Sequence, residues 1–206
     1  MKHIAVFASG QGSNFRSIYQ HVTETKLAAE FSLLVSDRKH PGAADFAYEQ
    51  GIPFLYLNHK AFSSTEEYAE RLIKELQKLQ VDWIILAGYL KLIPADVVKA
   101  FRHRIMNIHP ALLPSFGGPG MYGHHVHEAV IASGVKITGA TVHIVDEEYD
   151  TGPIVIQQTA PVSFEDTPET IAQRVLKIEH EIYPQAVAWA IQDKIKVHGR
   201  RVEILT

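Results

Sequence analysis

An asparagine and a histidine stand two residues apart near the middle of the chain, in Asn107-Ile108-His109-Pro110. The apolar run before them predicts a buried strand that ends here, because Pro110 and Pro114 prevent regular continuation. Side chains at i and i+2 of a strand share a face. The two groups could therefore stabilise an oxygen that becomes negative in a transition state, and the imidazole could move a proton near neutral pH. Ordinary turn residues at a polar strand end are the alternative.

Apolar runs and amphipathic stretches alternate before this point and would position it. We expect strands at 4–8, 31–36, 54–57, 83–87 and 104–108, and helices at 15–22, 41–50, 65–79 and 94–101, with a capping box at 64–67. The alternation predicts an α/β fold with a doubly wound, mostly parallel, Rossmann-like sheet and flanking helices. Ligands bind beyond the carboxyl ends of such strands, where 10–14, 88–89 and 107–109 all fall.

The second half of the chain predicts two long strands, 137–145 and 154–162, joined by an acidic turn. A helix is expected at 124–132, and a longer one begins at Thr167-Pro168 and runs to about Ile191, with a bend near Pro184. The tail around Gly199 is consistent with a small hairpin. No repeat or linker interrupts the chain, so we expect a single domain over residues 1–206.

Composition narrows the class of protein. The chain has 206 residues, a net charge of −3 and no cysteine. No segment gathers enough lysine and arginine to bind nucleic acid. The lack of cysteine excludes disulfides, thiolate catalysis and cysteine-bound zinc. No apolar run reaches membrane-spanning length and no signal peptide precedes the first strand, so we expect a soluble, cytoplasmic protein without a membrane partner.

The glycine-rich stretch Gly10-Gln11-Gly12-Ser13-Asn14 follows one strand and opens a helix. Backbone amides at a helix N-terminus attract phosphate, so this stretch is a candidate site for a phosphate monoester. It is incomplete as a dinucleotide motif, because Phe15 occupies the third glycine position, and it lacks the lysine of a Walker loop. A purely structural tight turn is the alternative.

The histidines at 124, 125 and 127 begin a helix. His124 and His127 lie one turn apart and could share a metal with His109 or Asp150, although solvated histidines at a helix start are the simpler interpretation. In the acidic turn, glycine and proline after Asp150 fix the backbone and could swing that carboxylate toward His109. His143, on the same strand face as Thr141, is either a buried structural histidine or a partner for this turn.

Together these stretches resemble the glycinamide ribonucleotide (GAR) transformylases of purine biosynthesis, within the wider formyltransferase family. The resemblance covers Ile4 to about Trp189 and is most specific at 107–114 and 150–154. The segments 10–14 and 179–184 point to the GAR enzymes in particular. It implies metal-independent transfer of a formyl group from 10-formyltetrahydrofolate to the amine of GAR through a tetrahedral oxyanion. The first half, 1–100, would bind phosphate, and 101–206 would hold the catalytic and folate sites.

The resemblance also implies roles for individual residues. The catalytic group is Asn107, His109 and Asp150, with His109 protonated and Asp150 keeping it charged; Thr141 and His143 support it. The residues implied for GAR are Gly12, Ser13, Asn14 and Glu179. Those implied for the folate are Tyr89, Leu90, Lys91, Leu92, Ile93, Asp146 and Glu147. The chain departs from the family pattern at Thr65 and Lys91, where arginine is expected, at Thr141, which replaces serine, and in a longer loop at 117–123.

Three other functions remain open from the sequence. A formyltetrahydrofolate deformylase would use the same scaffold with water as the acceptor. A non-catalytic nucleotide-binding domain would use only the glycine loop, and an NAD(P)-linked oxidoreductase is weakened by Phe15. The sequence is equally compatible with a monomer and a weak homodimer.

Overall fold

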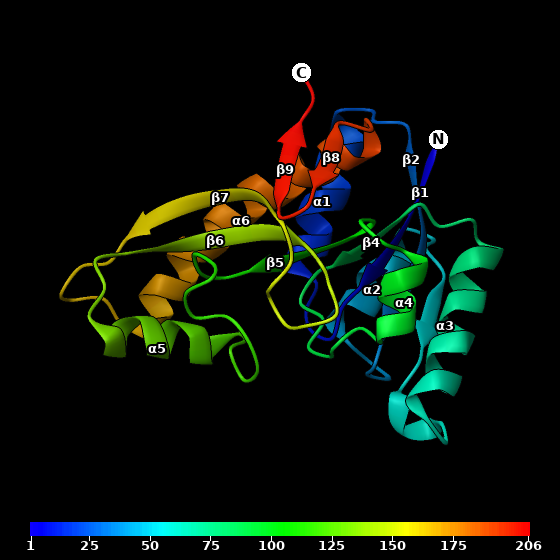
Figure 1. Ribbon diagram of the computed structural model, residues 1–206, viewed down its shortest axis with the longest axis horizontal. Helices are drawn as coiled ribbons and strands as arrows, with labels where there is room; N and C mark the ends of the chain where they lie inside the picture. Colours follow the sequence, from blue (N-terminus) through cyan, green and yellow to red (C-terminus); the bar gives the residue numbers. More distant parts are fainter.

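The computed structural model describes residues 1–206 and is built on one nine-stranded sheet, in the order β3-β2-β1-β4-β5-β6-β7-β9-β8 (Figure 1). The strands are β1 Lys2–Phe7, β2 Ala29–Ser36, β3 Phe54–Tyr56, β4 Trp83–Leu86, β5 Ile105–His109, β6 Ile137–Ile144, β7 Ile154–Pro161, β8 Ile195–His198 and β9 Arg201–Ile204. The helices are α1 Ser13–Glu24, α2 Gly42–Glu49, α3 Thr65–Lys78, α4 Ala95–Ala100, α5 His124–Ser133 and α6 Pro168–Ile191, with a short 3₁₀ turn η1 at His59–Ala61.

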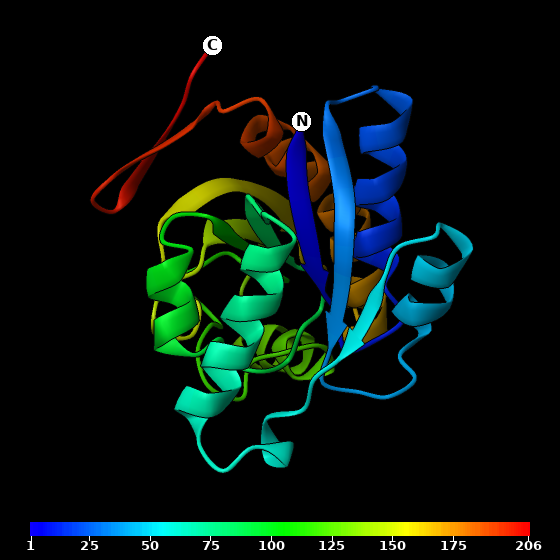
Figure 2. The same ribbon diagram turned by 90° about the vertical axis from the view of Figure 1, so that its right-hand side faces the viewer.

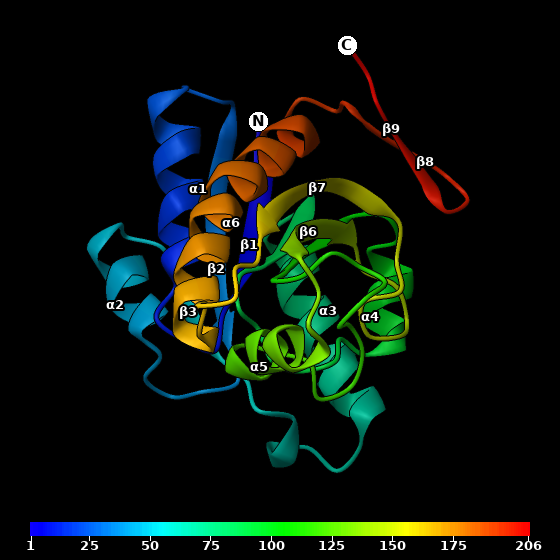
Figure 3. The same cartoon turned by 90° about the vertical axis from the view of Figure 1, so that its left-hand side faces the viewer.

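The alternation of β1 explains why helices cover both faces of the sheet. Ile4 and Val6 belong to the larger apolar core, which also contains Phe15 of α1 and many residues of α6. Ala5 and Phe7 point the other way, into a second core with α3 and α4. Figures 2 and 3 show α1, α2 and α6 on one side of the parallel strands and α3 and α4 on the other. The expected doubly wound α/β architecture is confirmed.

The sheet changes direction at β5. Strands β3, β2, β1, β4 and β5 pair in parallel, whereas β6 pairs antiparallel with both β5 and β7. Asn107 therefore faces Leu86 of β4 on one side and His143 of β6 on the other. The strand continues to His109, one residue beyond the expected end. The carboxyl end of β5 thus lies where ligands bind in open α/β sheets.

Gly12 shapes the turn from β1 into α1. Its backbone is left-handed, with φ of 77°, and a Cβ here would lie 2.8 Å from the Cβ of Ala43. Only glycine meets both conditions without strain. The turn therefore presents the N-terminus of α1, with its unpaired N–H groups, at the carboxyl edge of the sheet.

Helix α6 begins as expected and then passes through a proline. Thr167 caps it in a capping box with Thr170, and Pro168 is its first residue. The helix continues across Pro184, which has no N–H to donate to the carbonyl of His180. The hydroxyl of Ser17 in α1 donates to that carbonyl instead, at 3.0 Å. This contact binds α6 to α1, and both helices contribute to the site described next.

Two other expectations have definite outcomes. The hydroxyl of Ser64 accepts the N–H of Glu67, as a capping box requires, but the Glu67 carboxylate returns to Ser63 rather than to Ser64. The tail forms the expected hairpin, β8–β9, with Gly199 at its turn. None of the helices combines the length and the apolar composition needed to cross a membrane.

Candidate active site

A cavity of about 580 Å³ opens at the carboxyl end of β5. Asn107 and His109, two residues apart on that strand, both line it, as the strand alternation predicts. Most of the other candidate residues line the same cavity; they are Asn14, Tyr89, Leu90, Lys91, Leu92, Ile93, His143, Asp150 and Glu179. Side chains from widely separated parts of the chain therefore meet at the edge that the sequence indicated.

His109 is buried, with 3% of its surface exposed, and oxygen acceptors face both of its ring nitrogens. Nε2 donates to the carbonyl of Phe116 at 2.8 Å, and Nδ1 lies 3.6 Å from Oδ2 of Asp150. Burial lowers the pKa of His109 below its ordinary value, while Asp150 and the Phe116 carbonyl raise it and offset part of that loss. The two acceptors favour the imidazolium form that the resemblance implied, and burial opposes it.

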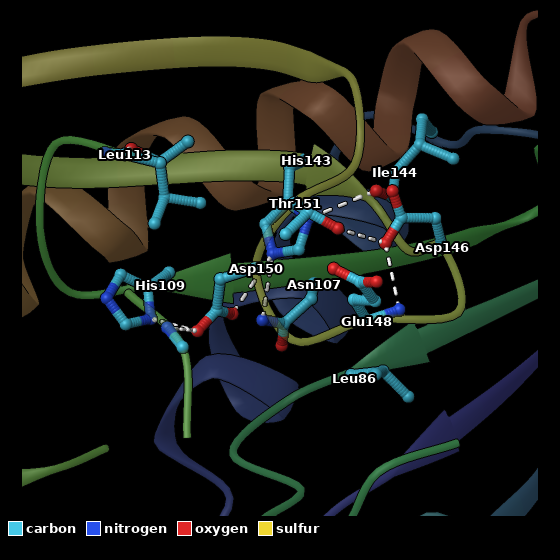
Figure 4. Close-up of polar contacts among 12 residues, drawn as sticks. Leu86, Asn107, His109, Leu113, His143, Ile144, Asp146, Glu148, Asp150 and Thr151 are labelled. Carbon is cyan, nitrogen blue, oxygen red and sulfur yellow. Dashed lines mark hydrogen bonds and ion pairs between the residues drawn. The ribbon is translucent and has the colours of Figure 1, made fainter. Parts of the chain in front are cut away.

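Asp150 reaches His109 from the loop between β6 and β7, as expected (Figure 4). Its backbone is left-handed, with φ of 58°, a conformation that aspartate tolerates better than most residues. Oδ2 accepts the N–H of Gly118 at 2.9 Å, and Oδ1 lies 3.6 Å from Nε2 of His143. Burial would raise the pKa of Asp150, but the polar groups around the carboxylate, among them the charge of His109 and the Gly118 N–H, outweigh it and lower the pKa. The carboxylate is therefore ionised at neutral pH.

His143 orients the amide of Asn107. Nδ1 of His143 lies 3.0 Å from the carbonyl of Ile144, which can only accept, so this nitrogen carries the proton. Nε2 is then free to accept a hydrogen bond from Nδ2 of Asn107 at 3.1 Å. One N–H of the Asn107 amide is used in this way, and the other is available to a ligand in the cavity.

Glu179 and Asn14 form a second polar pair in the same cavity. Both are 9% exposed, and Nδ2 of Asn14 donates to Oε2 of Glu179 at 2.6 Å. Burial raises the pKa of Glu179, and the Asn14 hydrogen bond lowers it in part. Oδ1 of Asn14 has no partner within the protein. Gly12 caps α1 and Ser13 is its first residue, so the glycine turn leads directly into this pair.

Two acidic residues expected at the folate lie outside the cavity, and their role there stays a prediction. Asp146 and Glu147 do not line the cavity with Tyr89; they line a neighbouring hollow on the other side of their loop. Asp146 is occupied within the loop, because its Oδ1 accepts from Oγ1 of Thr151 at 2.6 Å and from the N–H of Glu148 at 3.2 Å (Figure 4). Glu148 and Tyr149 line the cavity instead.

Thr141 supports the segment that follows His109. Its side chain is fully buried and does not line the cavity. Oγ1 donates to the carbonyl of Ala111 at 2.6 Å and accepts the N–H of Leu113 at 3.0 Å. A serine would supply the same hydroxyl, so the threonine keeps the polar contact.

The histidines of α5 have separate environments. Nε2 of His124 lies 3.4 Å from Glu128 and 3.6 Å from Glu169. His127 is 5% exposed and lines the cavity, and burial lowers its pKa. Groups of three or more potential ligands that could hold a metal ion are not found in the structure. The expectation of metal-independent chemistry stays a prediction.

Several contacts at the site could not be read from the sequence. The partners of His109 and Asp150 at Phe116 and Gly118 are backbone groups, which carry no residue-type signal. The contact made by Tyr183 could not be read either. Its hydroxyl lies 2.9 Å from the carbonyls of Leu86 and of Met106 at the ends of β4 and β5. The only available signal was a tyrosine one helical turn after Glu179, on the face that α6 buries.

Comparisons with known proteins agree with this geometry. Residues 2–187 match the family described as Formyl transferase. The chain is 46% identical over 196 residues to a chloroplastic phosphoribosylglycinamide formyltransferase of Arabidopsis thaliana, covering 95% of this chain and 67% of that protein. It is 39% identical over 187 residues to the phosphoribosylglycinamide formyltransferase of Bacillus subtilis, covering 91% and 93%. A crystal structure of glycinamide ribonucleotide transformylase 1 from Symbiobacterium toebii superposes with a TM-score of 0.93 at 35% identity, covering 100% of this chain and 95% of that one.

Proposed function

The chain belongs to the formyl transferase family, and we propose that it transfers the formyl group of 10-formyltetrahydrofolate to the amine of GAR in purine biosynthesis. One observation carries the proposal. An amide and an imidazole on one strand face, with a carboxylate 3.6 Å from the imidazole, share a cavity with a buried Asn–Glu pair beside a helix N-terminus. A site of this kind can hold two substrates together. The amide, imidazole and carboxylate would face the reacting groups, and the helix N-terminus would bind the phosphate of one substrate.

The reaction needs a group that stabilises negative charge at the formyl oxygen. When the GAR amine attacks the formyl carbon, a tetrahedral oxyanion forms. The free N–H of Asn107 and the protonated imidazole of His109 would donate to that oxygen, inside a cavity where such contacts are stronger than in water. Asp150 would favour the charged imidazole. Together with water, it would carry the proton from the attacking amine to the leaving nitrogen.

The Asn14–Glu179 end would bind GAR. The N-terminal amides of α1, following Gly12 and including Ser13, are suited to the ribose phosphate. Oδ1 of Asn14 has no partner in the protein and could accept a hydrogen from the ligand. Glu179 is buried beside it and could receive a hydroxyl or an ammonium group. The division into a phosphate-binding half, 1–100, and a catalytic and folate-binding half, 101–206, stays a prediction.

The folate would lie at the opposite side of the cavity, along Tyr89-Leu90-Lys91-Leu92-Ile93 and against Glu148 and Tyr149. Apolar side chains and backbone groups there can enclose a flat ring and read its polar edge. Lys91 is exposed and could meet the acidic tail of the folate. The cytoplasmic location and the choice between a monomer and a weak homodimer stay predictions.

The test is product formation from 10-formyltetrahydrofolate with and without GAR, followed by the absorbance change on loss of the formyl group and by mass detection of formyl-GAR. We expect formyl-GAR to form and turnover to require GAR. Formate release without GAR would instead assign the deformylase reaction to the same residues. Binding of GAR without either product would remove the catalytic assignment of Asn107, His109 and Asp150.

A further inference from the structure

The loop that carries Asp150 separates two hollows. Its inner side, with Glu148 and Tyr149, lines the cavity of the active site. Its outer side, with Asp146, Glu147 and Thr151, lines a second, open hollow together with Arg200 of the C-terminal hairpin. Glu148, Tyr149 and Asp150 line both hollows. Figure 1 shows this loop, between β6 and β7, beside the turn of the β8–β9 hairpin. What holds the outer side therefore affects where Asp150 stands on the inner side.

Arg200 contacts the loop directly. Its guanidinium Nη2 donates to the carbonyl of Thr151 at 3.0 Å, one residue after Asp150. The next residue, Arg201, pairs with Ile154 in the register of β9 and β7, just beyond the same loop. Ile195, Val197 and Val202 of the hairpin pack against the larger apolar core. The hairpin is thus anchored by apolar packing and reaches the loop with one cationic side chain.

The charge of the loop gives Arg200 a second effect. Asp146, Glu147, Glu148 and Asp150 place four carboxylates within five residues. Like charges this close repel one another, and a cation beside them reduces that repulsion. No other Lys or Arg lines the second hollow. The same guanidinium therefore donates a hydrogen bond to the loop backbone and lies beside its negative charge.

We propose that Arg200 is a positioning residue for the catalytic carboxylate: by holding the Thr151 carbonyl and offsetting the charge of the acidic loop, it keeps Asp150 within reach of His109. The inference rests on the proposed function for its kinetic readout, and it adds the hairpin to the parts of the chain that serve the site. The hairpin, 195–204, lies outside the residues matched by the family, 2–187.

The experiment compares Arg200→Met and Arg200→Lys with Arg201→Met, the neighbouring arginine of the same hairpin. Hydrogen exchange of the backbone amides at 146–152 reports loop order without requiring turnover. Steady-state kinetics report kcat separately from the KM for GAR. We expect Arg200→Met to speed exchange in this segment and to lower kcat about fivefold, as loss of one exposed charged hydrogen bond would do, with the KM for GAR unchanged.

The variants distinguish the two contributions of Arg200. Lysine keeps the charge but not the planar fork, so Arg200→Lys should recover part of the lost kcat, and the deficit of Arg200→Met should shrink at high salt. Arg201→Met should match the wild type in both readouts.

Three results would overturn the proposal: exchange at 146–152 that stays at the wild-type rate, faster exchange without any loss of kcat, or an equal loss in Arg201→Met. A wild type that exchanges slowly at 146–152 but makes no formyl-GAR would instead reject the proposed function. The exchange comparison still decides whether Arg200 holds the loop in that case.

Discussion

Strand β5 and the loop between β6 and β7 hold their parts of the site by different means. Asn107 and His109 lie in β5, which pairs with β6 along its length and with β4 up to Asn107. Asp150 lies in no strand, has a left-handed backbone, and is held by the Gly118 N–H and by contacts within and beside its loop. The sheet therefore fixes two of the three groups, and the third depends on a few local hydrogen bonds.

This difference makes strand β5 the rigid part of the site and the loop between β6 and β7 the part that can respond to a ligand. A strand within a sheet opens only when much of the fold opens, whereas loops open locally at low free-energy cost. The position of Asp150, unlike that of His109, can then change with pH, salt or substrate. The following variants test that contrast, beginning with the largest expected effect.

Replacing the imidazole tests the strand-borne side directly. We expect His109→Ala to lower kcat by about 10³-fold, because it removes a donor to the oxyanion together with a proton-transfer group. Formyl-GAR production by purified protein measures the loss. His125→Ala, an exposed histidine of α5, is the matched control and should keep wild-type activity. A His109→Ala enzyme within tenfold of the wild type would contradict the catalytic assignment.

Asp150→Asn tests the loop-borne side. We expect kcat to fall by about 10²-fold, since the ionised partner of the imidazole is lost while its shape is kept. Asp150 raises the pKa of His109 against the lowering effect of burial. Its neutralisation should therefore lower the pKa of His109 further, and the limb of the pH–rate profile that reports this group should move to lower pH. An unchanged profile would show that the two groups are not coupled during turnover.

Gly152→Ala changes the loop without altering any charged or polar side chain. A Cβ at this position would collide with the carbonyl of Ile144, so the loop must shift. We expect kcat to fall about tenfold, because a small displacement of Asp150 weakens its contact with the imidazole. Gly134→Ala is the control for general destabilisation. Its left-handed backbone, with φ of 68°, strains an alanine at the end of α5, although its Cβ would meet nothing within 4 Å. Equal kinetic losses in both variants would indicate general destabilisation.

Glu179→Gln tests a residue of helix α6, for comparison with the strand and loop residues above, and should change both substrate affinity and stability. We expect the KM for GAR to rise about tenfold, as for loss of a charged hydrogen bond. Burial raises the pKa of Glu179, so its contribution to stability is present below the unfolded pKa and is lost as pH rises through the folded pKa. The melting temperature of the variant, measured relative to the wild type, should therefore increase from acidic to neutral pH. A constant difference across this range would contradict the prediction.

Ser17→Ala should give the smallest effect and sets the baseline for stability alone. It leaves the His180 carbonyl without a donor, because Pro184 has none, and should cost about 1 kcal/mol of unfolding free energy. Denaturant titration measures the change, and kcat should stay at the wild-type value. Thr23→Ala is the control; its hydroxyl contacts the Tyr19 carbonyl within the same helix, where backbone hydrogen bonding already supplies a donor.

The same contrast explains what could be predicted from the sequence. The alternation of apolar runs specifies the parallel sheet, and strand geometry alone places Asn107 beside His109, so both predictions are confirmed by the structure. The loop gave a mixed result. Glycine and proline after Asp150 correctly indicated its approach to His109, but they could not show that Asp146 would bond within the loop and leave Glu148 facing the cavity.

Long-range contacts were beyond the reach of local patterns. Arg200 meets Thr151 across 49 positions of sequence, and the hydroxyl of Ser17 meets the His180 carbonyl across 163. Neither contact follows from periodicity, capping or turn chemistry, because each depends on how helices, strands and loops pack against one another in the folded protein. The position of a single side chain at such a contact is decided by tertiary structure.

The hydroxyl of Tyr183 limits how this enzyme could change its acceptor. Its single proton is shared between the carbonyls of Leu86 and Met106, so it fastens β4, β5 and α6 together next to Leu86 and Asn107, which line the cavity. Separating β4 from β5 would leave a buried phenol and two buried carbonyls without hydrogen-bond partners, which costs free energy. Room for a bulkier amine cannot come from separating β4 and β5. New acceptor specificity would have to evolve through the loops around the cavity, leaving the strand-borne amide and imidazole in place.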